Sequence, residues 1–113
     1  MRISVSYKGE NFISDVSLAD NFWLRLSGYM FRARPHHPGI LFEPASAIHS
    51  FFMFFSLDLV FLDGENRVVK VVRNMKPWRH TWFYLKARKV LELPVGILPP
   101  QIKEGEFLEV KHV

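Results

Sequence analysis

The chain has no cysteine among its 113 residues. Disulfides and thiolate zinc sites are therefore excluded, and a metal ion would have to be held by imidazole and carboxylate oxygen. Recognised metal motifs such as His-Glu-x-x-His are also absent, as are serine-nucleophile elbows, P-loops and dinucleotide fingerprints. We therefore expect neither a metal nor a cofactor.

Long apolar runs are missing as well. The N-terminus, MRISVSYKGE, has no apolar region of signal-peptide type, and no stretch reaches the length of a transmembrane helix. We expect a cytoplasmic protein with no membrane partner. With 49% hydrophobic residues, the chain is long enough for one compact domain and too short for two ordinary ones, so a single domain over residues 1–113 is expected.

Acidic residues are absent from one long stretch, although the whole chain carries only a modest charge of +4. No Asp or Glu lies between Glu65 and Glu92. The same stretch contains Arg67, Lys70, Arg73, Lys76, Arg79, Lys86, Arg88 and Lys89, interleaved with Trp78, Trp82, Phe83 and Tyr84. A block of this kind creates a positive potential that raises the encounter rate with anions.

Apolar and polar residues alternate in several short segments, which predicts strands. The expected strands are 2–8, 11–16, 40–42, a hairpin over 57–73, 81–85, 90–93 and 107–110. One amphipathic helix is expected from Leu18 to Ser27, because Ser17 and Asp20 form a start like a capping box and Gly28 is placed to end it. Many short strands with one helix favour a mostly β fold, a small sandwich or barrel.

The run from Ile48 to Asp63, IHSFFMFFSLDLVFLD, is almost wholly apolar and aromatic. It is too short and too polar to span a bilayer, so we interpret it as a buried strand whose odd-numbered positions face the core. His49 and Asp58 are embedded in it. A buried ionisable residue must be paired, neutralised or used in chemistry.

Residues of this run, with elements on either side, resemble a known family. The matching elements are Gly28 to Arg32, Gly39 to Phe42, His49 with Met53 and Asp58, Lys76 to Arg79, and Leu91 to Gly96. In this order they are similar to the signature of domain-of-unknown-function family 192 of bacteria and archaea, from about Ala19 to the end of the chain. The resemblance implies a small β-sandwich of jelly-roll-like type with a short helix, and no established activity.

Three ionisable residues are candidates for chemistry, and each has a structural alternative. His49 can act as a ligand or base, but no nucleophile accompanies it, which favours a histidine held by one backbone carbonyl. Asp58 is expected to pair with Arg32 or Arg34, or to cap a nearby loop through backbone N–H groups. Glu92 lies between two leucines and is expected to be an exposed strand carboxylate.

The basic and aromatic residues predict a non-catalytic binding module for an anionic ligand or partner protein. Nucleic acid is one candidate anion, because aromatic rings can stack on bases. Lysines and arginines on the solvated face of an edge strand are the structural alternative. Taken with the ionisable residues, the candidate binding residues are Arg32, Arg34, His49, Asp58, Lys76, Trp78, Arg79 and Glu92.

Two further functions stay open. The first is a small enzyme, such as a hydrolase, with His49 as base and Asp58 or Glu92 as the orienting carboxylate. The second is an interaction protein that dimerises through exposed aromatic residues, so both a monomer and a homodimer are compatible with the sequence.

Overall fold

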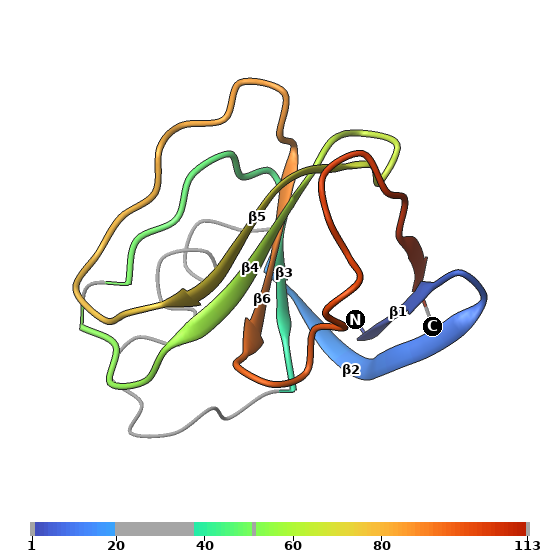
Figure 1. Ribbon diagram of the computed structural model, residues 1–113, viewed down its shortest axis with the longest axis horizontal. Helices are drawn as coiled ribbons and strands as arrows, with labels where there is room; N and C mark the ends of the chain where they lie inside the picture. Colours follow the sequence, from blue (N-terminus) through green and yellow to red (C-terminus); the bar gives the residue numbers. More distant parts are fainter. Residues whose placement is uncertain (1, 20–37, 51, 113) are drawn as a thin grey trace.

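Seven strands build the part of the chain that the structure, a computed structural model, describes: residues 2–19, 38–50 and 52–112. They are β1 (Arg2–Tyr7), β2 (Glu10–Ala19), β3 (Ile40–Phe42), β4 (Leu57–Leu62), β5 (Val68–Met75), β6 (Lys89–Pro94) and β7 (Glu109–His112). They form one sheet in the order β5-β4-β6-β3-β2-β1-β7 (Figure 1). All neighbouring strands are antiparallel except β2 and β3, which are parallel.

The two edges of this open sheet approach each other at one end. Arg67, just before β5, and Phe107, just before β7, form an isolated antiparallel bridge. The amide of Val68 donates to the carbonyl of Glu106 at 2.7 Å, and the amide of Leu108 donates to that of Asn66 at 3.0 Å. These bonds satisfy edge groups that would otherwise be open to pairing with another chain. The sheet is therefore open, with its two edges joined at one end by this bridge.

Two apolar clusters lie on opposite faces of the central strands β3, β4 and β6. The first cluster includes Ile3 and Val5 of β1 together with Leu91 of β6, so the β1–β2 end of the sheet curls over this face. The second includes Phe61 of β4 and Met53, and is covered by segments 45–55 and 75–87. Because both faces are covered, every residue of β4 is buried.

The prediction of a mostly β fold is confirmed, and most strand positions are correct. β1, β3 and β6 match their expected ranges within one residue, and the hairpin over 57–73 is the β4–β5 pair. β2 is longer than expected, and the last strand begins at Glu109 rather than at residue 107. No strand forms over residues 81–85, which make up a loop.

The predicted helix is not borne out. Its first residues, Leu18 and Ala19, are the end of β2, where they pair with Leu41 and Phe42 of β3. Residues 20–27 lie outside the described part of the chain. Ser17, the expected cap, donates its amide to the carbonyl of Gly39 at 3.0 Å, so strand pairing overrides the local helix signal. The described residues contain no helix, and hence none of the length and hydropathy that a bilayer span requires.

The central run is a strand over less than half its predicted length. Residues 57–62 form β4, and their odd positions face the second cluster as expected. Before Leu57 the chain forms turns, and the side chains of Phe52 and Phe54 are exposed. Phe52 has a φ of 65°, which is incompatible with a strand. The prediction of one continuous buried strand from Ile48 is therefore wrong.

Candidate functional site

The candidate binding residues fall into three places. Arg32 and Arg34 lie outside the described residues. Asp58 and Glu92 are in the sheet, on β4 and β6. The remaining four lie beyond the strand ends, in the segments around residues 49 and 76–79: His49, Lys76, Trp78 and Arg79.

Ser50 organises the turn that carries three of these residues. Its side chain is completely buried, and its Oγ lies 2.7 Å from the carbonyl of Lys76 and 3.2 Å from that of Arg79. The same Oγ accepts the amide hydrogen of Arg79 at 2.9 Å, while the Ser50 carbonyl accepts that of Trp78 at the same distance. A buried hydroxyl thus fixes the backbone of the turn, and the side chains of Lys76, Trp78 and Arg79 are exposed. This role could not be predicted from the sequence, because a serine within an aromatic run indicates only an interruption of the apolar pattern.

The whole 76–88 loop is bonded to the 45–50 segment. The amide of Thr81 donates to the carbonyl of Ile48 at 2.8 Å, and the amide of Tyr84 donates to that of Ser46 at 3.0 Å. The amide of Ala45 donates to the carbonyl of Arg88 at 2.9 Å. Together with the bonds of Ser50, these contacts hold the loop along its length.

His49 and His80 form an isolated antiparallel bridge between the same two segments. Next to it, the rings of Phe52 and Trp78 meet edge to face with centroids 4.9 Å apart. Both aromatic residues have left-handed backbone, with φ of 65° and 63°. Such conformations cost about 1–3 kcal/mol each in a bulky residue and are found preferentially at functional sites. The surface around His49, Phe52 and residues 76–80 is therefore the strongest candidate site.

Asp58 has a structural partner. It is 4% exposed, and its Oδ1 accepts the amide hydrogen of Asn74 at 2.8 Å. Asn74 has a φ of 55° and lies where the β4–β5 register shifts, between the pairs Leu57–Met75 and Leu59–Val72. The carboxylate therefore caps an irregular backbone position, which is the second of the two roles expected for it.

Glu92 is buried, so the prediction of an exposed carboxylate is wrong. It is only 3% exposed, because β6 is flanked by β3 and β4 and apolar clusters cover both faces. Its neighbours in register are Ile40 and Leu59, and among the described residues its Oε1 has no hydrogen-bond partner. Burial away from water raises the pKa of Glu92 to about 8.

The register places Asp58 and Glu92 on opposite faces of the sheet. Asp58 is paired with Leu93, which belongs to the first cluster, whereas Glu92 is paired with Leu59, which belongs to the second. Residues paired across antiparallel strands share a face, and successive residues alternate. The two carboxylates therefore do not form a pair. No three His, Asp or Glu side chains within residues 2–19, 38–50 and 52–112 come together as metal ligands.

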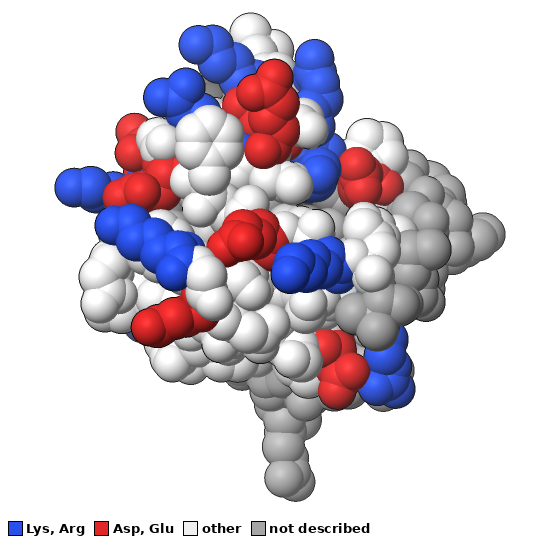
Figure 2. Space-filling model, turned by 90° about the vertical axis from the view of Figure 1, so that its right-hand side faces the viewer, with Lys and Arg blue, Asp and Glu red and all other residues white. Residues whose placement is uncertain are grey.

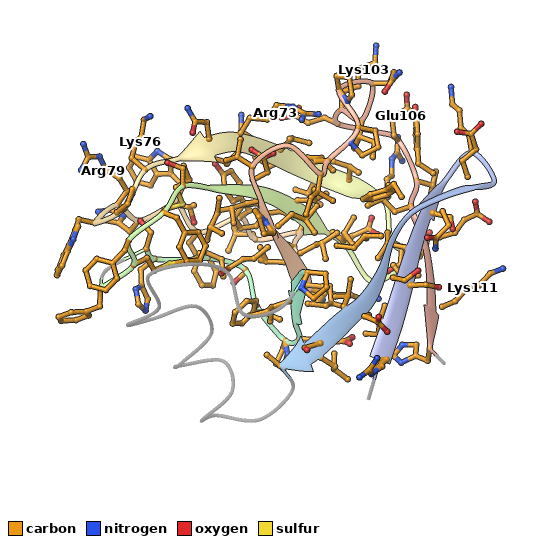
Figure 3. All side chains as sticks on the ribbon, turned by 90° about the horizontal axis from the view of Figure 1, so that it is seen from below. Arg73, Lys76, Arg79, Lys103, Glu106 and Lys111 are labelled. Carbon is orange, nitrogen blue, oxygen red and sulfur yellow. The ribbon has the colours of Figure 1, made fainter. Side chains whose placement is uncertain are left out.

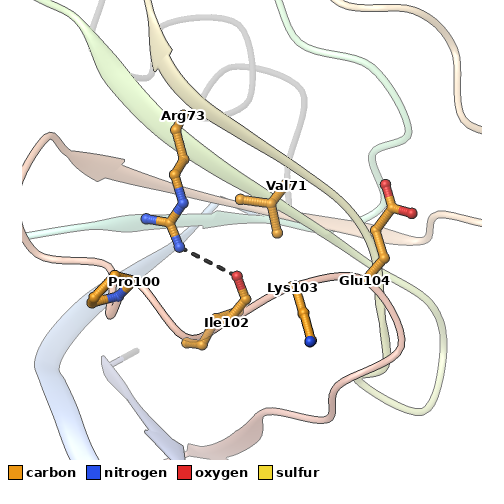
Figure 4. Close-up of a pocket in the computed structure, with 6 residues that line it drawn as sticks. All are labelled: Val71, Arg73, Pro100, Ile102, Lys103 and Glu104. Atoms are coloured by element: carbon orange, nitrogen blue, oxygen red, sulfur yellow. Dashed lines mark hydrogen bonds between the residues drawn. The ribbon is translucent and has the colours of Figure 1, made fainter.

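A separate concavity of about 630 Å³ lies beside β5, and it is lined by Val71, Arg73, Pro100, Ile102, Lys103 and Glu104 (Figure 4). The guanidinium of Arg73 points across it and donates to the carbonyls of Pro99 at 2.8 Å and Ile102 at 3.2 Å. These bonds tie β5 to the following loop. None of the candidate binding residues lines this concavity. The guanidinium of Arg73 is already hydrogen-bonded to backbone carbonyls.

Charge is distributed differently at the two ends of the molecule. On the face beside β1, β2 and β7, basic and acidic side chains are interspersed (Figure 2). Lys76 and Arg79 project together at the other end, far from Lys103 and Lys111 (Figure 3). Among the described residues, no carboxylate forms an ion pair with Lys76, Arg79 or their loop neighbours Lys86 and Arg88. Within the described part of the chain, the lysine and arginine side chains of the 76–88 loop therefore have no ion-pair partner.

Fold and loop together define a small, mostly β domain with a basic and aromatic surface beyond its strand ends. Residues 3–110 match the model of domain-of-unknown-function family 192, described as an uncharacterised group. The chain belongs to this family, as the resemblance of its motifs predicted.

Relatives among known proteins are also uncharacterised. The chain is 39% identical to a UPF0127 protein of Pyrococcus abyssi over 83% of this chain and 79% of that protein. It is 36% identical to one of Pyrococcus horikoshii, over 83% of this chain and 80% of the relative. A Thermococcus sibiricus UPF0127 protein is 33% identical, and the match spans 80% of this chain and 62% of that protein.

Two solved structures share the fold. A protein of unknown function from Novosphingobium aromaticivorans has a TM-score of 0.78 and 22% identity, with 96% of this chain and 84% of that chain covered. A Sinorhizobium meliloti protein described as a "putative transcription regulator" has a TM-score of 0.72 and 21% identity, with 96% and 92% covered. At these identities, the similarity establishes the fold alone.

Proposed function

We propose that the protein is a non-catalytic binding module whose 76–88 loop receives an anionic ligand or partner. The observation that carries this proposal is the turn held by Ser50, which exposes Lys76, Trp78 and Arg79, while neither Lys76 nor Arg79 forms an ion pair with a carboxylate of the described residues. A planar aromatic side chain between two cations supplies both electrostatic attraction and an apolar contact surface.

Preorganisation adds to the support. Binding costs less free energy when the contacting loop is already ordered, because few side chains and backbone groups must be immobilised. The 76–88 loop is bonded to the 45–50 segment at Ala45, Ser46, Ile48 and Ser50. Its basic side chains are therefore presented from a fixed backbone.

One observation supports a second candidate, a small enzyme with His49 as base. The raised pKa of Glu92 is a perturbation typical of functional sites. In this enzyme, Glu92 would be the carboxylate that orients His49. Asp58 is less suited to that role, because it already caps Asn74 from the other face of the sheet. If the enzyme is the correct reading, a hydrolase substrate panel will reveal an activity that His49→Ala and Glu92→Gln both abolish.

Heparin chromatography tests the binding module. Wild type should be retained and eluted by salt. The variant K76E/R79E should elute at a clearly lower salt concentration, because contacts between basic side chains and the sulfate groups of heparin weaken as ionic strength rises. The control K103E/K111E has the same change in net charge but places it at the other end of the molecule (Figure 3). Equal elution of the two variants, or unchanged retention of K76E/R79E, would contradict the proposal.

A further inference from the structure

Three large apolar side chains in the middle of the 76–88 loop project into solvent. Trp82 is 83% exposed, Phe83 66% and Leu85 79%. We name these three residues the apolar tip. Isolated exposed apolar residues are normal, but large ones grouped within four positions of one loop mark an interaction surface.

The backbone conformation explains why all three are exposed. In a strand, Trp82 and Tyr84 would share one face, but this segment is a loop, and Tyr84 alone turns inward. The ring of Tyr84 packs on that of Phe61 with centroids 4.7 Å apart, within the second apolar cluster. Tyr84 thus anchors the loop, and the apolar tip faces away from the core.

Hydrogen bonds fix the backbone next to the apolar tip. The amides of Thr81 and Tyr84 donate to the 45–50 segment, and the Tyr84 carbonyl accepts from the amide of Ala87 at 3.0 Å. The carbonyl of Trp82 accepts the hydroxyl of Thr81 at 2.9 Å. These bonds order the loop on both sides of the apolar tip, so the three side chains are presented from a backbone that is already fixed.

Basic residues border the apolar tip. Lys86 and Arg88 follow it, Lys76 and Arg79 precede it, and all four side chains are exposed. No carboxylate lies in the sequence between Glu65 and Glu92. The partner that complements this arrangement is apolar within and negatively charged at its surface.

We propose that the apolar tip inserts into the headgroup region of an anionic lipid surface while the bordering lysines and arginines contact the headgroups. The proposal rests on the proposed function, since it identifies the anionic partner. Tryptophan and phenylalanine favour the membrane interface, and lysine and arginine side chains extend toward phosphates from beside it. The sequence predicted no membrane partner because no segment has spanning length, but a peripheral contact needs none.

Two other occupants fit less well. A second copy of the chain would bring the same four cations together with no carboxylate between them, and like charges repel. A single-stranded nucleic acid would stack on Trp82 and Phe83, but the equally exposed Leu85 has no ring on which a base can stack. A lipid surface uses all three side chains.

Vesicle sedimentation tests the proposal on the full chain. Wild type should co-sediment with vesicles of equal parts phosphatidylcholine and phosphatidylglycerol, and much less with phosphatidylcholine alone. The variant W82S/F83S/L85S should lose at least about tenfold in partitioning, because each buried apolar side chain contributes that much or more. It retains Tyr84 and every cation, so its heparin retention should be unchanged. The control V95S/F107S removes exposed apolar side chains outside the loop and should sediment like wild type.

The outcomes separate the two proposals. Heparin retention without sedimentation of wild type on anionic vesicles would overturn the lipid proposal and leave the binding module standing. Unchanged heparin retention of K76E/R79E would overturn the binding module itself. Wild type that does not bind vesicles could still bind single-stranded oligothymidylate saturably, or dimerise as measured by light scattering. If the tip variant abolishes either of these, that partner replaces the lipid surface as the occupant of the apolar tip.

Discussion

Ser50 and Arg79 are joined by hydrogen bonds that run in both directions. The Ser50 amide donates to the Arg79 carbonyl at 2.7 Å, and the Arg79 amide donates to Ser50 Oγ at 2.9 Å. The two residues are 29 positions apart in the sequence. A single buried hydroxyl therefore determines the shape of the turn that carries the exposed cations.

Replacement of Ser50 by alanine should destabilise the protein and weaken its retention on heparin. The change leaves the amide of Arg79 without its acceptor next to the buried position of Ser50, which costs about 1–3 kcal/mol of unfolding free energy. Urea denaturation measures this loss. The exposed Ser14, which donates to Asn11 at 3.2 Å, provides the control Ser14→Ala, expected within about 0.5 kcal/mol of wild type. Equal stability of the two variants would show that the Ser50 hydroxyl is dispensable.

Asp58 should matter as a hydrogen-bond acceptor. Asp58→Ala removes the acceptor of the Asn74 amide and should lower the unfolding free energy by about 1–3 kcal/mol. Asp58→Asn keeps an oxygen at the same position and should lose clearly less. Thermal denaturation of both variants distinguishes this role from an enzymatic one. An equal loss in the two would mean that the negative charge, rather than the cap, is what the fold requires.

Gly39 should tolerate no side chain. A Cβ at this position would lie 2.8 Å from Cδ2 of Leu93 and 3.1 Å from Cδ1 of Ile13, and both of these side chains are buried. Gly39→Ala should therefore destabilise the protein by about 1–3 kcal/mol, the usual cost of overpacking a core. Gly64→Ala is the matched control, because no atom lies within 4 Å of its Cβ position. A chemical denaturation curve of Gly39→Ala that coincides with that of the control would refute the crowding.

The strands could be predicted because their signal is local. In β1, Ile3 and Val5 alternate with polar residues, and the β4–β5 hairpin is marked by the turn at Gly64. The helix prediction failed because it also rested on a local signal, whereas the structure of this segment is decided by a distant contact. Leu18 pairs with Leu41 of another strand, and no local pattern indicates that pairing. Propensity is a weak guide wherever a distant strand competes for the same residues.

The candidate site was only partly predictable. The absence of acidic residues around Lys76 and Arg79 is visible in the sequence, but the bonds of Ser50 to that turn join distant segments. The burial of Glu92 was missed for a similar reason. Alternation indicates that Glu92 and Leu91 face opposite sides of β6, but it does not reveal that a second cluster covers the side of Glu92.

Glu92 should make the stability of the protein depend on pH. Burial raises its pKa from 4.5 to about 8, so between these values the folded chain keeps a proton that the unfolded chain has released. Unfolding then releases a proton and becomes more favourable as the pH rises. The contribution of Glu92 to stability is therefore greatest below pH 4.5 and is lost as the pH rises to about 8.

Glu92→Gln removes this titration, because the amide is neutral at every pH. Its stability relative to wild type should increase with pH, by at most about 1.4 kcal/mol per pH unit, and level off above the pKa of Glu92. Urea denaturation at a series of pH values measures the difference between the two curves. The exposed Glu65, in the β4–β5 turn, gives the control Glu65→Gln, which makes the same chemical change outside the core. Because titrations elsewhere cancel in the difference, a constant offset between Glu92→Gln and wild type would mean that Glu92 ionises in the folded protein as readily as in the unfolded one.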